Sequence, residues 1–143
     1  MAIRRATFYR CKHCGSVVMR YSIEGQEPQC CGEPMEVLEP YTEDNPGPAA
    51  AEKHLPVIKR EGKVVTVQIG EVEHPMDPDH YIEWVYALTE MGSQFVKLKP
   101  GVKPNARFQF AEDIPLTFYI YCNKHGLWAT SMFESMQDED DDA

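Results

Sequence analysis

The sequence predicts an all-β protein in which a small, cysteine-rich, metal-bound β unit precedes an antiparallel β-sandwich of immunoglobulin type. Three observations predict this fold class. Four of the five cysteines stand in two close pairs before residue 40. From residue 52 onward, short β-rich runs alternate with Gly and Pro turns. Between these parts, residues 40–51 (PYTEDNPGPAAA) have the composition of a linker.

The domain boundaries follow from the same composition. We expect the cysteine-rich unit at residues 1–40, a linker at 41–51, the sandwich at 52–135 and a disordered acidic tail at 136–143. The formal net charge of −9 argues against a nucleic acid partner. The sequence has no apolar run long enough to cross a bilayer and no signal peptide, so we expect no membrane association and a cytoplasmic location.

The first unit carries two cysteine motifs, CKHCG at residues 11–15 and CCGEPM at residues 30–35. Four thiolates in two close pairs indicate one tetrahedral sulfur site. A unit this small has little core, so the metal would supply much of its folding energy. Disulfides or free thiols are the alternative interpretation. His13 lies between two of the cysteines, and we expect it to be solvated because four sulfurs already complete a tetrahedral site.

The sandwich is expected to contain about seven short strands. The strands that the pattern marks lie at residues 63–69, 81–89, 95–99, 106–111, 116–122 and 127–133. Val65, Val67 and Ile69 alternate onto one face of the first of these. Residues 81–89 fit both a strand and a helix, and the turn after them favours a strand. In the first unit, residues 17–21 predict a further strand.

Four of the five histidines and the last cysteine form a second candidate metal site. Cys122 and His125 are three residues apart, and three more histidines lie upstream at positions 54, 74 and 80 in contexts typical of loops. Pro75 and Pro78 keep one of these segments out of a helix or a central strand. Four imidazoles and one thiolate leave one coordination position vacant. Zinc prefers four ligands, and calcium and magnesium prefer oxygen, so this set best suits iron(II).

Two other classes of protein share some of these features. A blue-copper electron-transfer protein also uses a β-sandwich, and Cys122, His125 and Met132 resemble its ligand loop. Copper would need only two of the four histidines, and Met132 falls far along a predicted strand. A binding module with a structural zinc ribbon would leave the histidine set unexplained.

Five motifs together resemble the desulfoferrodoxin family, the two-iron superoxide reductases. CKHCG and CCGEPM resemble the rubredoxin-like desulforedoxin unit, and EKHLP, HPMDPDH and CNKHGLW resemble the neelaredoxin domain. The resemblance implies two irons per chain. The ligands of a ferric tetrathiolate would be Cys11, Cys14, Cys30 and Cys31. The ligands of a ferrous iron would be His54, His74, His80 and His125 in the equatorial plane and Cys122 in the axial position.

The resemblance also implies an activity and partners. The reaction would be the one-electron reduction of superoxide to hydrogen peroxide, which detoxifies superoxide, with electrons from a rubredoxin-like donor. The backbone N–H groups of residues 123–125 are candidates to hydrogen-bond the axial sulfur. Lys53 would attract the anion and organise proton delivery, and Glu52 would occupy the sixth position of the oxidised iron. We also expect a homodimer. The alternative function is electron transfer without superoxide chemistry.

Overall fold

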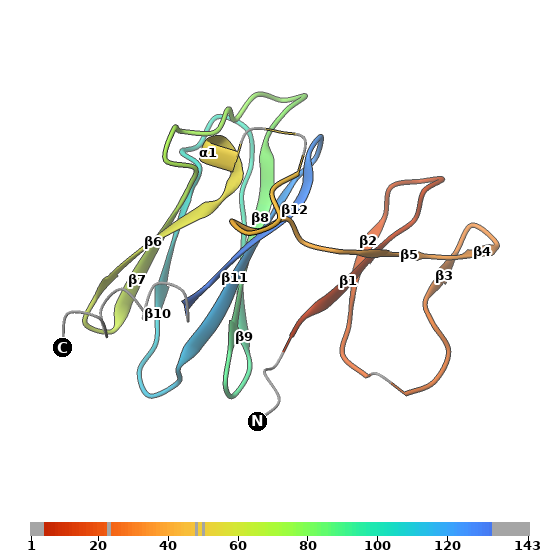
Figure 1. The fold of residues 1–143 in the computed structure, drawn as a ribbon, viewed down its shortest axis with the longest axis horizontal. Coiled ribbons are helices and arrows are strands. Elements are labelled where there is room, and N and C mark those ends of the chain that lie inside the picture. Colours follow the sequence, from red (N-terminus) through yellow and green to blue (C-terminus); the bar gives the residue numbers. More distant parts are fainter. Residues whose placement is uncertain (1–4, 23, 48, 50, 133–143) are drawn as a thin grey trace. The chain divides into compact units, whose positions relative to one another are not determined.

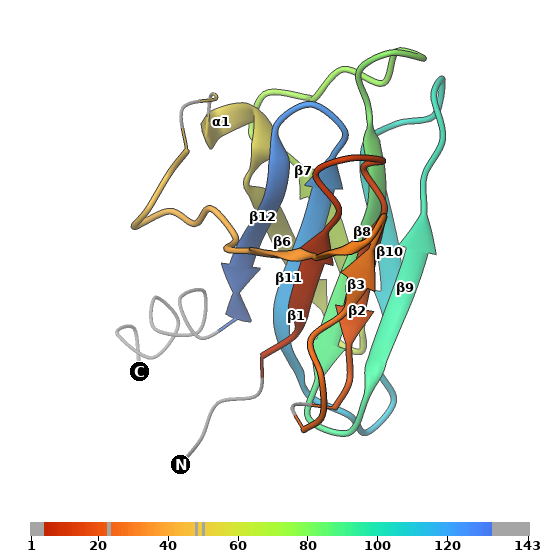
Figure 2. The same ribbon diagram turned by 90° about the vertical axis from the view of Figure 1, so that its right-hand side faces the viewer.

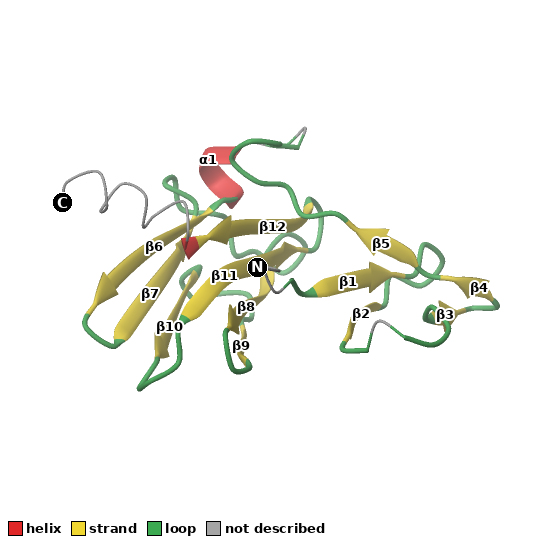
Figure 3. Cartoon of the chain, turned by 60° about the horizontal axis from the view of Figure 1, so that its bottom comes forward, coloured by secondary structure: helices red, strands yellow, loops and turns green. Residues whose placement is uncertain are grey.

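The computed structural model describes residues 5–132, apart from residues 23, 48 and 50. The chain divides between Glu39 and Pro40 into two compact units. Strands make up most of the regular structure (Figure 3). The expected acidic tail at 136–143 lies outside the described residues.

The first unit is built from five short strands. They are β1 Thr7–Arg10, β2 Val17–Arg20, β3 Gln29–Cys30, β4 Glu33–Pro34 and β5 Glu36–Leu38. One sheet has the order β2-β1-β5 with antiparallel pairing, and β3 and β4 form a separate two-stranded hairpin. The strand predicted at 17–21 corresponds to β2. The cluster of buried residues in this unit consists of Tyr9, Cys11 and Met35, with Val18 and Cys30 packed against it.

The second unit contains seven strands. They are β6 Pro56–Glu61, β7 Val64–Ile69, β8 Ile82–Thr89, β9 Ser93–Lys97, β10 Asn105–Gln109, β11 Pro115–Cys122 and β12 Gly126–Ser131. The sheet orders are β10-β7-β6 and β12-β11-β8-β9, and all pairs of strands are antiparallel. Figure 1 shows both sheets, and Figure 2 shows β12 and β9 at the two edges of the four-stranded sheet. The predicted all-β fold, a small metal-binding unit before a sandwich, is confirmed.

The core lies between these two sheets. Val65, Val67 and Ile69 of β7 are fully buried, as their alternation predicts. Phe118 on β11 and Trp128 on β12 face them from the other sheet and are also fully buried. The ambiguous segment at 81–89 is a strand, β8, because it pairs with β11 on one side and β9 on the other.

The segment expected as a linker, residues 41–51, is part of the second unit. Tyr41 pairs with Trp128 in a parallel bridge, and its backbone bonds to Leu127 and Ala129 at 2.9 Å each. The Tyr41 ring also packs 5.0 Å from the Trp128 ring. The many prolines predict a linker, and one aromatic side chain and two backbone bonds hold its first residue, Tyr41, at the edge of β12.

A short helix, α1 Ala51–His54, follows this segment. The sequence analysis expected loops and strands here. The Leu55 N–H bonds to the Ala51 carbonyl at 3.0 Å, and Pro56 then ends the helix because the residue before a proline avoids helical geometry. In the described part of the chain, no helix is long and apolar enough to span a membrane.

Candidate metal centres

The turn between β11 and β12 places Cys122 and His125 side by side. Cys122 is the last residue of β11 and pairs with Gly126, the first residue of β12. Gly126 has a φ of +82°, a left-handed conformation that favours glycine. The Cys122 Sγ lies 3.8 Å from His125 Nδ1. The tight hairpin therefore points a sulfur and an imidazole nitrogen at one spot.

Three other histidines reach the same spot from two further segments. His54 ends α1, and His74 and His80 lie in the loop between β7 and β8. His54 Nε2 is 3.0 Å from His125 Nδ1 and 3.1 Å from His74 Nε2. His74 Nε2 is 3.5 Å from the Cys122 sulfur. One ligand atom from each of the five residues lies within 4.8 Å of every other. The structure therefore brings together the whole set that the sequence analysis selected.

The surroundings of His80 indicate that this group of five residues binds a cation. Its Nε2 atom is buried and has no hydrogen-bond partner. A buried polar atom without a partner is costly, so such an atom calls for an explanation. A metal ion among the converging nitrogens would accept its lone pair. The residues present therefore fit a metal.

Contacts outside the set fix how the imidazoles point. His74 Nδ1 lies 2.7 Å from the Pro75 carbonyl oxygen, so Nδ1 carries the proton and Nε2 presents its lone pair. The His54 ring stacks on Trp128, with centroids 4.7 Å apart and planes 17° apart. Trp128 Nε1 in turn donates to the His125 carbonyl at 3.0 Å. A single buried tryptophan thus orients two of the histidine segments.

Burial sets the electrostatics of the site. It lowers the pKa of His74 to about 4, so this imidazole is neutral at pH 7 and able to bind a metal. Burial also raises the pKa of the Cys122 thiol, and the backbone N–H groups of Lys124 and His125 oppose this by donating to the sulfur. Of the three N–H groups that the sequence suggested, that of Asn123 goes elsewhere: it donates to the Tyr81 carbonyl at 3.2 Å.

The site has one buried side and one side open to solvent. His54, His74 and Cys122 are buried, whereas His80 and His125 are half-buried. A small solute can therefore approach past the two half-buried imidazoles. The buried members keep water away from the sulfur.

The two residues expected to act on the substrate lie on α1. Lys53 is exposed, and within the described part of the chain its side chain forms no ion pair. Lys124, on the other side of the site, lies 3.9 Å from Asp79. The side chain of Glu52 lies outside the described residues, so its expected role stays a prediction.

The sequence analysis missed one residue that positions this site. Gly70, after β7, has a φ of +84°, and its N–H bonds to the Leu55 carbonyl at 3.0 Å. A Cβ at this position would lie 2.6 Å from the Lys53 carbonyl oxygen. Gly70 therefore lets α1 and His54 approach the end of β7. The Ile69-Gly70 step at the end of an alternating strand was the available signal.

The four remaining cysteines form a second group in the first unit. Cys11 and Cys14 come from the turn after β1, Cys30 is the last residue of β3, and Cys31 lies in the turn between β3 and β4. Cys14 Sγ lies 3.6 Å and Cys31 Sγ lies 3.9 Å from Cys30 Sγ. Their four sulfurs all lie within 4.8 Å of one another. Cys31 has a φ of +54°, unusual for a residue with a side chain.

The thiols of this group influence each other strongly. Backbone N–H donation, chiefly from Cys14, lowers the pKa of Cys11 to about 6. The pKa of Cys30 rises to about 12, chiefly because its thiol shares a hydrogen bond with Cys14. Cys11 therefore ionises readily, whereas Cys30 retains its proton. Four thiolates this close require a cation, which the tetrathiolate interpretation supplies.

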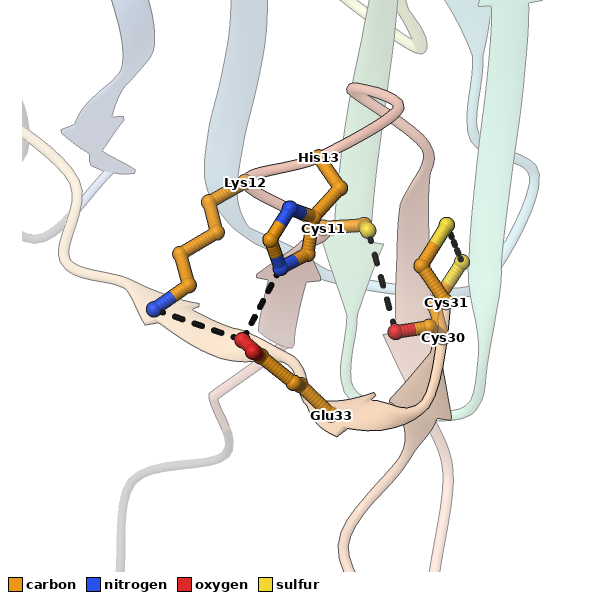
Figure 4. A network of polar contacts seen from close by, with 6 residues as sticks. All are labelled: Cys11, Lys12, His13, Cys30, Cys31 and Glu33. Atoms are coloured by element: carbon orange, nitrogen blue, oxygen red, sulfur yellow. Dashed lines mark hydrogen bonds and ion pairs between the residues drawn. The ribbon is translucent and has the colours of Figure 1, made fainter.

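His13 is not part of the sulfur group. It is exposed, as expected, but not free: its Nε2 lies 2.9 Å from Glu33 Oε2 (Figure 4). Lys12 lies 3.4 Å from the same carboxylate. Hydrogen bonds from His13 and Lys12 hold the pKa of Glu33 below its usual value. This polar bridge joins the two cysteine turns.

The blue-copper interpretation is not supported by this geometry. Met132 is 5% exposed and belongs to the sandwich core. It follows β12, whose first residue adjoins His125, so the length of the strand separates the two. Four histidines converge on Cys122, where a copper site of that class would use two.

A small β unit with a four-cysteine group, followed by a β-sandwich with a four-histidine, one-cysteine group, defines a class of β protein with two groups able to hold a metal. The pattern of the desulfoferrodoxin family matches residues 47–131, which include all five members of the histidine and cysteine group. The chain belongs to the desulfoferrodoxin family. Membership implies iron as the metal.

Individual relatives cover most of the chain. A desulfoferrodoxin homologue of Archaeoglobus fulgidus is 41% identical over 120 residues, which is 84% of this chain and 92% of the relative. The desulfoferrodoxin of Nitratidesulfovibrio vulgaris is 39% identical over 84% of this chain and 91% of its own. The crystal structure of the superoxide reductase from Treponema pallidum is similar with a TM-score of 0.74 and 31% identity, covering 90% of this chain and 99% of that one.

Proposed function

We propose that this chain is a superoxide reductase. Such an enzyme adds one electron and two protons to superoxide, which gives hydrogen peroxide without release of oxygen. The observation that carries the proposal is the convergence of four imidazole nitrogens and the Cys122 sulfur within 4.8 Å. The similarity to the superoxide reductase of Treponema pallidum supports it. The function is the detoxification of superoxide.

The ligand roles follow from the donor set. His54, His74, His80, His125 and Cys122 would together hold a ferrous iron. The iron, when bound, supplies the one-electron couple that superoxide oxidises. Burial keeps the His74 imidazole neutral, and the Lys124 and His125 N–H groups limit the basicity of the Cys122 thiolate. Half-buried His80 and His125 leave an approach for the substrate.

The first unit would hold a second iron as a ferric tetrathiolate, with Cys11, Cys14, Cys30 and Cys31 as ligands. A rubredoxin-like protein would supply electrons to the chain. All five cysteines are free, which agrees with a reducing compartment such as the cytoplasm. We further propose a homodimer, because the small first unit has exposed strand edges. Sedimentation that shows a monomer at micromolar concentration would exclude the dimer.

Lys53 is the proposed guide for the anionic substrate, and Glu52 the proposed sixth ligand of the oxidised iron. The chain carries a net charge of −9, so its long-range field repels superoxide. Screening limits that field to about 8 Å at physiological salt, and a nearby lysine then dominates. The Lys53→Ala variant should react more slowly with superoxide at low salt, and the deficit should shrink as salt rises. Lys59→Ala, an exposed lysine in mid-strand on β6, is the matched control. Equal rates for the two variants would leave Lys53 an ordinary surface residue.

The decisive experiment measures metal and reaction together. Purified protein should contain two irons per chain, one with ferric tetrathiolate absorption and one that becomes coloured only on oxidation. Pulsed superoxide should oxidise the second iron of the reduced protein and yield peroxide with no oxygen. Stoichiometric copper, or loaded iron that superoxide does not oxidise, would contradict the proposal and favour plain electron transfer.

A further inference from the structure

The connection between β9 and β10 carries a concentration of positive charge in an otherwise acidic protein. Residues 91–111 contain Lys97, Lys99, Lys103 and Arg107 but none of the 23 Asp and Glu residues of the chain. All four basic side chains are exposed. The rest of the sequence therefore has a net charge more negative than the −9 of the whole. This surface is therefore positively charged, whereas the rest of the chain is negatively charged.

Three of these lysines line a surface hollow of about 620 Å³, which we call the lysine hollow. Its lining residues are Lys97, Leu98, Lys99, Val102, Lys103 and Asn105. Val102 is 37% exposed, so the hollow also offers an apolar contact. Within the described part of the chain, neither Lys99 nor Lys103 forms an ion pair. Both ammonium groups are therefore available to a partner.

The acidic residue Glu83 interacts with one lysine of the hollow. Leu98 N bonds to the Glu83 carbonyl at 2.9 Å, which places Glu83 beside the hollow. Burial raises the pKa of Glu83, and Lys97 opposes that shift. The charge of Glu83 thus offsets that of Lys97, and the charges of Lys99 and Lys103 remain.

The lysine hollow lies next to the four-histidine centre. The Gly101 N–H bonds to the Met76 carbonyl at 2.9 Å, and Met76 belongs to the loop that carries His74 and His80. Lys97 pairs in register with Trp84 on β8, and Trp84 pairs with Tyr121, the neighbour of Cys122. Two strand spacings of about 4.8 Å separate Lys97 from Tyr121 along this path. A protein docked here would stand within a short distance of the iron ligands.

We propose that the lysine hollow is the docking surface for the electron donor, a small acidic one-electron carrier protein. This inference rests on the proposed function. Positive side chains with one apolar contact, on an acidic protein, select a partner whose surface carries clustered carboxylates. In each encounter the reduced donor loses one electron and the ferric iron of the histidine centre gains it. No proton or group is transferred.

The test uses the full iron-loaded chain and a zinc-substituted acidic rubredoxin, which binds without passing electrons. The double variant Lys99→Glu/Lys103→Glu should raise the dissociation constant, measured by calorimetry at low salt, by about tenfold or more. Added salt should weaken wild-type binding and reduce the difference. The matched control Lys59→Glu/Lys63→Glu reverses two exposed lysines on and beside β6 and should change the constant by less than about twofold.

A second measurement separates this inference from the function on which it rests. Pulsed superoxide should oxidise the reduced wild-type and both double variants at similar rates. If superoxide fails to oxidise the wild type, the proposed function fails, whatever the binding constants show. If both double variants bind rubredoxin alike, the docking inference is overturned. The docking inference is also overturned if Lys99→Glu/Lys103→Glu slows only the reaction with superoxide, since the hollow would then guide the substrate.

Discussion

The two metal-ligand groups of this chain sit in opposite kinds of surroundings. In the first unit, Cys14 and Cys31 are exposed, and the buried cluster beside them has three members. In the second unit, His54, His74 and Cys122 are buried against a sandwich core of 14 buried residues. The first group thus has little protein structure to hold it, whereas the second is held by a complete fold. The comparison shows that one metal would shape its unit and the other would occupy a site already shaped.

Strand length explains much of this difference. Cys30 ends a two-residue strand, and the other three sulfurs come from two turns. Cys122 ends an eight-residue strand that pairs with neighbours on both sides. A turn held by few backbone bonds depends on its metal, while the end of a central strand keeps its place without one.

Removal of the metals should have the largest effect on stability, and it tests the difference between the two units most directly. When the iron is chelated from reduced protein, the first unit should unfold, since structural metal sites of this size contribute on the order of 10 kcal/mol to folding. The second unit should stay folded because its core is its own. Amide hydrogen exchange, read separately for residues before and after Glu39, measures both outcomes. Protection that persists in the metal-free first unit would show that its small core suffices.

Two cysteine substitutions should separate the centres chemically. Cys31→Ser should abolish or greatly alter the tetrathiolate absorption and leave the oxidation of the second iron by superoxide largely intact. Cys122→Ser should do the reverse, because it removes the sulfur ligand of the second group. Visible spectra of both variants measure the tetrathiolate absorption, and pulses of superoxide measure the oxidation of the second iron. A similar loss of superoxide reduction in both variants would mean that the two units do not act independently.

Spacing in the sequence was enough to select both ligand groups. Cysteine pairs, and histidines beside prolines, predict metal ligands because few other roles need those residue types at that spacing. The alternation of Val65, Val67 and Ile69 predicts a strand with one face in the core. Among the features that escaped prediction are helix α1, strand β6 and the pairing of Tyr41 with β12. The helix has four residues and the Tyr41 bridge has one, so neither is long enough to show a hydrophobic period in the sequence. Tertiary contacts determine the structure of both. The bridge from His13 to Glu33 escaped because it joins residues 20 positions apart.

A glycine substitution should test how the fold positions the second centre. Gly70→Ala meets three penalties: a left-handed φ of +84°, a clash of its Cβ with the Val72 carbonyl oxygen, and a second clash with the Lys53 carbonyl oxygen at 2.6 Å. Gly62→Ala is the matched control, because Gly62 has a φ of +62° and open space around its Cβ. The control should lose about 1 kcal/mol in the free energy of unfolding, and Gly70→Ala about 3 kcal/mol or more. Gly70→Ala should also alter the spectrum of the histidine-bound iron, since α1 must move. Equal losses in the two variants would show that α1 adapts freely.

The smallest expected effect is a pH dependence confined to the second unit. Burial lowers the pKa of His74 to about 4, below the ordinary value of 6.5, so between these values the unfolded chain binds more protons than the folded one. His74 therefore contributes stability that is fully present above about pH 6.5 and is lost as the pH falls toward 4. The loss in the metal-free protein should reach at most about 3 kcal/mol. Urea unfolding of the metal-free chain at several pH values, followed by Trp128 fluorescence, measures it. His74→Gln should flatten the dependence, whereas His13→Gln should not, because His13 is exposed. An unchanged slope in His74→Gln would show that the other histidines of the group carry the titration.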